Sequence, residues 1–237
     1  APIEKLLNST NPNQQREALW TLDALNQLSN RHLKTGLDAA DYRVRAATLR
    51  IISNQSIANP ECQTWVTEKL SDSHPQVRLE AINTWQRYCD PSTAEVLFKF
   101  FDTEQDQYTK FLLTQALKDT QSFWLAKLER NPISNSPDSL IDVLSVVNSD
   151  QAVGPLLKLL KTLPGQKNEQ KIIQLIGQRG NPSQLKQLFE FGLATPKLTN
   201  SIIATLLDTS KKRKVRVRFA PEKLKTYFTK FPATMNL

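Results

Sequence analysis

The sequence predicts an all-α protein, a right-handed α-solenoid of six to seven antiparallel helix hairpins. Apolar residues recur every three or four positions through most of the 237 residues, which is the pattern of amphipathic helices. Eight of the 13 prolines each precede such an apolar run rather than interrupting it. Only six glycines are present, too few for the frequent turns of an all-β fold.

Several of the expected helices start where a proline follows Asn, Asp, Ser or Thr, the pairing of an N-cap residue with proline at N1. Loops of two to six residues join them, which makes consecutive helices antiparallel. The expected helices cover residues 2–8, 12–28, 30–39, 42–53, 60–71, 75–88, 91–102, 105–120, 122–130, 137–148, 151–163, 167–178, 182–193, 196–210 and 221–231.

An internal repeat supports the hairpin arrangement. Segments 13–22, 42–51 and 75–84 align, and each contains an arginine followed by a small residue and then large apolar residues. The three arginines, Arg16, Arg45 and Arg78, are 29 and 33 residues apart, the length of two short helices with their turns. Because such a hairpin cannot bury its own apolar stripe, we expect the hairpins to stack and share one elongated core.

The sequence LSDSHPQVRLEA of residues 70–81 resembles the HEAT-repeat signature, in which Leu-x-Asp ends the first helix and Val-Arg-x-x-Ala opens the second. The resemblance covers residues 1–120. It implies that Asp72 and Arg78, six residues apart, form hydrogen bonds that tie consecutive repeats together. In the fourth repeat Asp102 is retained and Tyr108 replaces the arginine. The implied ladder comprises Arg16, Arg45, Asp72, Arg78 and Asp102, although Thr10 and Ala39 stand at the Asp position of the first two repeats.

A narrower resemblance follows from the order of segments 16–22, 44–50, 77–81 and 106–124. This order is similar to the helical segment of large secreted bacterial proteins that join a sugar-dehydrogenase-like β-propeller, a HEAT segment and a cytochrome c module. The resemblance implies a periplasmic or secreted protein, and the Ala-Pro start is typical of a piece of a longer chain. The propeller and the haem-binding Cys-x-x-Cys-His are absent from these residues, so neither activity is assigned to them.

The two halves are predicted to differ in regularity. Residues 1–130 are expected to form HEAT-like repeats, and residues 131–237 to continue the same solenoid as irregular helical repeats. The Asn-Pro-Ile-Ser-Asn-Ser-Pro sequence of residues 131–137 marks the break between them.

The net charge of +8 is confined to one stretch. Residues 211–230 hold nine basic side chains and one acidic one, which leaves 22 of each over residues 1–210. This distribution argues against a nucleic-acid-binding face along the chain. We interpret residues 211–218 as a solvated basic connection, with a nuclear-localisation motif or a contact to nucleic acid or anionic lipid as alternatives. Its cations are Lys211, Lys212, Arg213, Lys214, Arg216 and Arg218.

No motif for catalysis or for metal or cofactor binding is found, so no catalytic residue and no cofactor is expected. His32 and His74 have no partner at metal-ligand spacing, and neither a phosphate loop nor a nucleophile elbow occurs. Cys62 and Cys89 are expected at the same end of one hairpin, as buried free thiols in preference to a disulfide. The four tryptophans are expected in packing between repeats, with Trp65 or Trp124 as the exposed exceptions.

These observations favour a non-catalytic scaffold that contacts other proteins or neighbouring domains of its own chain. The surface of the second helices, with Arg43, Arg50 and Arg87 outside the apolar stripe, is the expected partner surface. A free-standing intracellular HEAT adaptor and a helical-repeat nucleic-acid-binding protein are the alternatives. No apolar run approaches the ~18 residues of a membrane span.

Overall fold

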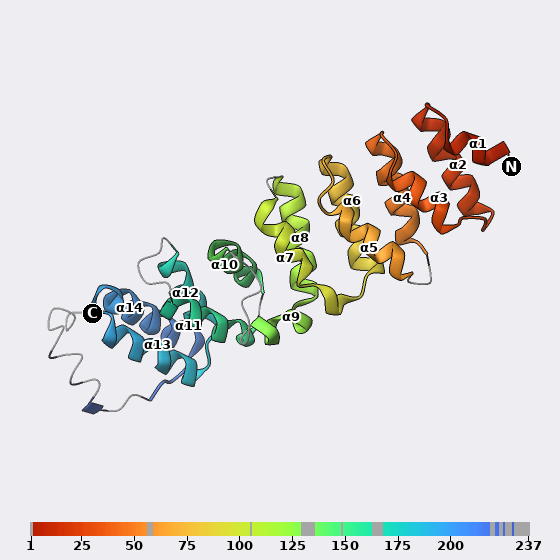
Figure 1. The fold of residues 1–237 in the computed structure, drawn as a ribbon. Helices are drawn as coiled ribbons and strands as arrows, with labels where there is room; N and C mark the ends of the chain where they lie inside the picture. Colours follow the sequence, from red (N-terminus) through yellow and green to blue (C-terminus); the bar gives the residue numbers. More distant parts are fainter. Residues whose placement is uncertain are drawn as a thin grey trace. The chain divides into compact units, whose positions relative to one another are not determined.

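The computed structural model describes residues 2–55, 59–104, 106–128, 136–147, 149–162, 168–218, 221, 222, 225 and 229. Within them the chain forms fourteen α-helices and two 3₁₀ turns, with no strand (Figure 1). The predicted all-α helical-repeat fold is therefore confirmed. The expected helix at 221–231 lies mostly outside the described residues.

The chain divides into two compact units, Ala1–Trp124 and Leu125–Leu237. The sequence-based division into residues 1–130 and 131–237, and one solenoid continuing through both, stay predictions.

The first unit consists of four helix hairpins, each of which pairs a first helix with a second helix. The hairpins are α1–α2, α3–α4, α5–α6 and α7–α8, and the second helices α2, α4, α6 and α8 pack in succession (Figure 1). The helix bounds are α1 Pro2–Leu7, α2 Pro12–Ala24, α3 Asn30–Leu37, α4 Tyr42–Ser53, α5 Pro60–Lys69, α6 Pro75–Tyr88, α7 Val96–Thr103, α8 Gln107–Asp119 and α9 Gln121–Leu128, the last crossing into the second unit.

The core of the first unit is shared between hairpins, as the stacking argument requires. The Thr84 hydroxyl of α6 donates to the Leu49 carbonyl oxygen of α4 at 3.0 Å. The Trp124 ring meets the Phe98 ring edge-on, with centroids 5.0 Å apart, and both side chains are fully buried. The prediction that Trp124 could be an exposed exception is therefore wrong. Trp20 is instead the tryptophan that is 40% exposed.

The second unit contains helices α10 to α14, paired as α11–α12 and α13–α14 after a single α10. Gly177 of α12 permits a close approach to α14, because a Cβ at this position would lie 2.5 Å from the Thr205 methyl carbon. The bounds are α10 Pro137–Val146, α11 Val153–Thr162, α12 Glu169–Arg179, α13 Pro182–Ala194 and α14 Pro196–Arg213.

Several predicted helix boundaries are wrong, and the helix expected to end at residue 28 ends at Ala24. The helices expected at 91–102 and 151–163 each begin as a short 3₁₀ turn, Pro91–Thr93 and Asp150–Ala152, before the α-helix starts. The helix expected to end at residue 210 continues to Arg213, because lysine and arginine are good helix formers and favour the negative end of the helix dipole.

Gly36 of α3 tests the close packing of α3 against α4. A Cβ at Gly36 would lie 2.3 Å from the Thr48 Oγ1 atom, and the Thr48 side chain is buried and hydrogen-bonded to the Val44 carbonyl oxygen. Gly36→Ala should therefore lower the free energy of unfolding by about 1–3 kcal/mol, although alanine in a helix normally adds about 1 kcal/mol. Urea denaturation measures the change. The double variant with Thr48→Ala should recover part of the loss, and a stabilised single variant would contradict the prediction.

Candidate binding surfaces

Arginine ties connect consecutive hairpins of the first unit. Arg45 of α4 makes a bidentate pair with Asp72, which follows α5, with N–O distances of 2.9 and 2.8 Å. The same guanidinium donates to the Ala39 and Ala40 carbonyl oxygens at the start of its own hairpin turn. The Arg45 and Asp72 side chains are 11% and 7% exposed, so this pair is largely removed from solvent.

The next tie joins Arg78 of α6 to Glu104 at the end of α7, at 2.7 and 3.0 Å. Arg78 also donates to the Asp72 carbonyl oxygen at 3.0 Å, so the two ties are continuous through residue 72. Hydrogen bonding to Glu104 raises the pKa of the Arg78 guanidinium. Glu104, two residues beyond the predicted Asp102, therefore holds the acidic position of the fourth repeat.

In the fourth repeat, the position that Arg45 and Arg78 hold in the preceding repeats was predicted at Tyr108. This prediction is wrong. The N-cap residues Asp41, His74 and Asp106 fix the register of the second helices. Arg45 and Arg78 come four residues after their N-caps, and Lys110 holds this position in α8. The Lys110 ammonium lies 4.8 Å from the centroid of the Phe101 ring, a cation–π contact.

Arg16 occupies the arginine position of the first repeat without a tie to a carboxylate. It donates to the Asn13 side chain at 3.0 Å and lies over the Trp20 ring at 5.6 Å. The reason is visible in the sequence, since Ala39 stands at the acidic position of the next repeat.

The second unit has arginine ties of another kind, which the sequence analysis missed. Arg179 at the end of α12 donates to the Leu144 and Ser145 carbonyl oxygens at the end of α10, at 2.5 and 2.6 Å. Arg213 at the end of α14 donates to the Gly177 and Gly180 carbonyl oxygens at the end of α12, at 2.8 and 2.9 Å. Each arginine satisfies carbonyl groups that a helix end leaves without intrahelical partners. The available signal was the 34-residue spacing of the two arginines.

The predicted partner surface on the second helices is partly engaged in local ion pairs. Arg43 pairs with Asp41 at 2.8 Å, and this hydrogen bonding lowers the pKa of the Asp41 carboxyl to about 2. Arg50 of α4 pairs with Glu80 of α6. Arg87 is exposed near the end of α6. The three arginines therefore lie on helices of the predicted surface but do not form one cluster of free charges.

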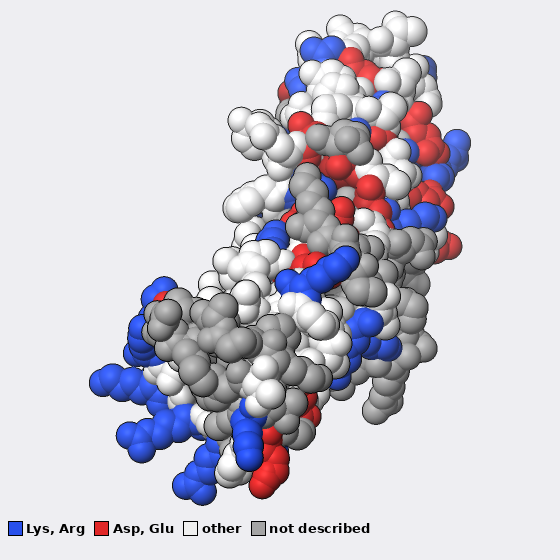
Figure 2. Space-filling view, turned by 90° about the vertical axis from the view of Figure 1, so that its left-hand side faces the viewer, with Lys and Arg blue, Asp and Glu red and all other residues white. Residues whose placement is uncertain are grey.

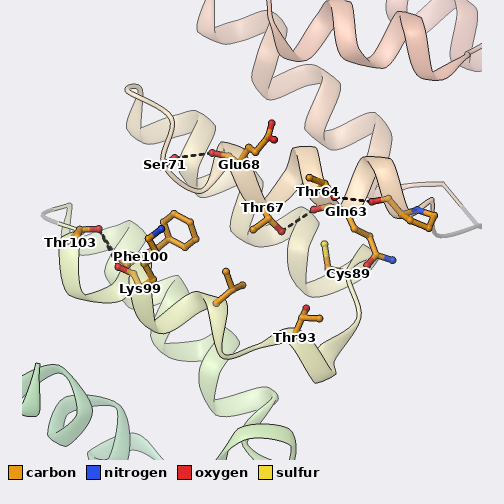
Figure 3. A pocket seen from close by; sticks show the side chains of 12 residues that line it. Gln63, Thr64, Thr67, Glu68, Ser71, Cys89, Thr93, Lys99, Phe100 and Thr103 are labelled. Atoms are coloured by element: carbon orange, nitrogen blue, oxygen red, sulfur yellow. Dashed lines mark hydrogen bonds between the residues drawn. The ribbon is translucent and has the colours of Figure 1, made fainter. Parts of the chain in front are cut away.

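A groove in the layer of first helices was not predicted. It has a volume of about 700 Å³ and lies between α5 on one side and α7 with its preceding 3₁₀ turn on the other (Figure 3). Direct contact between α5 and α7 is sparse because Cys89 leaves α6 in an extended conformation and α7 starts only at Val96. The lining residues are Pro60, Gln63, Thr64, Thr67, Glu68, Ser71, Cys89, Thr93, Val96, Lys99, Phe100 and Thr103.

The chemistry of this α5–α7 groove is apolar with hydrogen-bond acceptors. The Thr64 and Thr67 hydroxyls donate to the Pro60 and Gln63 carbonyl oxygens of the preceding helical turn, at 3.2 and 2.9 Å. Their protons are therefore not available to a ligand in the groove. The threonines therefore offer methyl groups and acceptor oxygens. One residue of each charge sign, Glu68 and Lys99, completes the lining.

Cys89 lines this groove and Cys62 lies on α5, and both are free thiols. Cys62 is fully buried and Cys89 is 7% exposed. Burial raises the pKa of both thiols, that of Cys89 to about 12, so both are protonated at neutral pH. A protonated thiol is a poor nucleophile and a poor metal ligand.

The basic segment is divided by the structure. Lys211, Lys212 and Arg213 form the last turn of α14, and residues 214–218 continue without helix. In this part Lys214, Arg216 and Arg218 are exposed, while the two valines between them are half-buried. Exposed and half-buried residues therefore alternate from Lys214 to Arg218.

Metal-type side-chain clusters and membrane-spanning helices are both absent from the described residues. No cluster of three or more His, Cys, Asp or Glu side chains suited to a metal ion occurs among them. Among the same residues, no helix combines the length and the apolar character that crossing a bilayer requires.

Comparison with known proteins bears on the first unit. Residues 30–118 match the family model described as HEAT repeats, and this span contains both arginine–carboxylate ties. These residues are similar to HEAT repeats. The HEAT family is generally non-catalytic, and its members generally mediate protein interactions. The solvent-facing groove and the arginine ties thus belong to repeats of known architecture.

The chain is also similar to a solved structure of an engineered protein from the Northeast Structural Genomics Consortium. The identity is 18%, and the alignment covers 89% of this chain and 96% of that chain. The TM-score of 0.34 is too low to support an argument from this likeness. No curated protein matches the chain.

The Arg78–Glu104 tie is expected to stabilise the HEAT repeats strongly. Arg78→Met would remove the guanidinium from the Glu104 carboxylate, which is 5% exposed. Breaking such a buried pair should cost about 3 kcal/mol of unfolding free energy. Arg87→Met on the same helix is the matched control, with an expected change within about 0.5 kcal/mol. Equal losses in the two variants, measured by chemical denaturation, would contradict the role of the tie.

Asp72 should make the stability depend on acidic pH. Burial acts to raise the pKa of the Asp72 carboxyl, but hydrogen bonds from Arg45 and from the His74 amide outweigh it, and the pKa lies below its usual 3.8. A carboxyl with a lowered folded-state pKa stabilises the fold above its unfolded pKa and loses this effect as the pH falls through the folded value. Wild type should therefore exceed Asp72→Asn in stability from pH 7 to about 4, and the difference should shrink below that. Asp23→Asn is the control, and a difference that persists at about pH 2 would refute the prediction.

Proposed function

We propose that the chain is a non-catalytic helical-repeat scaffold that binds another protein, or a neighbouring domain of its own chain, in the α5–α7 groove. The observation that supports this proposal is the groove itself. Its volume of about 700 Å³ falls within the range of ligand sites, and its walls belong to two helices of a HEAT-repeat segment.

The lining indicates the kind of segment that the groove accepts. Val96 and Phe100 offer apolar contact, the threonine oxygens accept hydrogen bonds, and Gln63 can both donate and accept. An extended segment with an apolar side chain directed at Phe100 and with free backbone N–H groups fits this chemistry. Arg43, Arg50 and Arg87 on the second helices stay a proposal for a second partner surface.

A narrower proposal concerns the parent protein. The resemblance around Arg16, Arg45 and Arg78 supports a place between a dehydrogenase-like propeller and a cytochrome c module of a secreted redox-associated protein. The reading frame on both sides of the chain decides this point.

Filling the groove should weaken binding. Thr67 faces the groove from α5 (Figure 3), so Thr67→Trp places an indole ring inside it. Extended peptides selected on the wild-type chain from a random display library should bind this variant about tenfold more weakly, a difference of about 1.4 kcal/mol. Their affinity is measured by fluorescence anisotropy.

The matched control is Gln76→Trp, on the exposed first turn of α6. It should leave peptide affinity unchanged. The proposal is wrong if no peptide is enriched on the wild-type chain, or if Thr67→Trp binds the enriched peptides as well as wild type. Circular dichroism verifies that both variants are folded.

A further inference from the structure

The residues after α14 form a row of cations with a regular spacing. Lys214, Arg216 and Arg218, here named the cationic strip, are exposed at alternate positions, and Val215 and Val217 between them are half-buried. Alternating exposure is the pattern of an extended chain, in which side chains on one face are about 7 Å apart. Arg216 and Arg218 are therefore expected on one side of the backbone, about 7 Å apart, with Lys214 at the turn that precedes them.

The strip starts from a fixed point in the second unit. Lys214 ends α14 in the left-handed conformation, with φ 54° and ψ 27°, and so turns the chain away from the helix axis. Arg213 directly before it is held by the Gly177 and Gly180 carbonyl oxygens. The strip thus projects from an anchored helix end.

The charges of the strip are not compensated. Residues 211–218 contain six basic side chains and no acidic one. Lys212 pairs with Asp208 at 3.0 Å, whereas Lys214, Arg216 and Arg218 form no ion pair in the part of the chain that the structure describes. Figure 2 shows lysine and arginine side chains that project into solvent from the second unit.

We propose that the cationic strip binds an extended acidic segment of a partner protein, with carboxylates at alternate residues. This inference rests on the proposed scaffold function and names a second site for it. An extended acidic segment repeats its side chains at the same spacing of about 7 Å, and guanidinium groups pair with carboxylates in bidentate geometry. Single-stranded nucleic acid is less suited, because the residues between the cations are valines rather than aromatic rings for base stacking.

The test compares two labelled peptides of equal composition, about ten residues long, at low salt, where the Debye length exceeds the length of the strip. One peptide alternates Ser and Glu, and the other has all Glu residues in one block. The alternating peptide should bind the full chain more tightly. The triple variant Lys214→Gln, Arg216→Gln, Arg218→Gln should lose about tenfold of this affinity, since exposed pairs contribute modestly each.

A charge-matched variant distinguishes the strip from general attraction to a basic protein. Lys161→Gln, Lys186→Gln and Lys197→Gln remove three exposed charges from other helices of the second unit and should keep the affinity. Equal binding of both peptides, or equal losses in both triple variants, refutes the proposal. So does tighter strip-dependent binding of oligo(dT) or of phosphatidylserine vesicles. Thr67→Trp should leave the Ser-Glu peptide affinity intact, which separates failure of this site from failure of the groove.

Discussion

The structure depends on one constraint: a hairpin of two short helices has more apolar surface than it can bury alone. Contact between successive hairpins removes this surface from water, and the spacing of hairpins is then fixed by the side chains that cross between them. In the first unit these side chains include Arg45 with Asp72 and Arg78 with Glu104. Buried guanidinium–carboxylate pairs tolerate little displacement, because a carboxylate without its partner is costly away from solvent.

The α5–α7 groove arises from the same constraint. The second helices α4, α6 and α8 carry the ties and stay in contact. Irregular chain geometry is therefore found in the layer of first helices. The extended residue Cys89 and the 3₁₀ turn at Pro91–Thr93 delay the start of α7 and open the groove. A binding site can thus form in this layer while the packing of the second helices is kept.

The sequence predicted most helices because their starts are encoded locally. Pro12, Pro60 and Pro75 stand at N1 after capping residues, and the apolar period of three to four residues predicts the helix that follows each of them. Asp90-Pro91 has the same form but starts a 3₁₀ turn, a difference that tertiary packing decides. The candidate sites were harder to predict from the sequence. The groove depends on where α7 is placed, and the partners of Arg179 and Arg213 are backbone carbonyls, which have no signature in the sequence.

The two kinds of arginine tie run in opposite directions along the chain. In the first unit an arginine reaches the carboxylate of the following hairpin, whereas in the second unit it reaches back to the preceding helix end. Loss of the hairpin α1–α2 would therefore leave no carboxylate without an arginine partner, since Arg16 forms no ion pair among the described residues. Loss of α13–α14 would instead uncap α12. Removal of α13–α14 should accordingly cost more stability than removal of α1–α2.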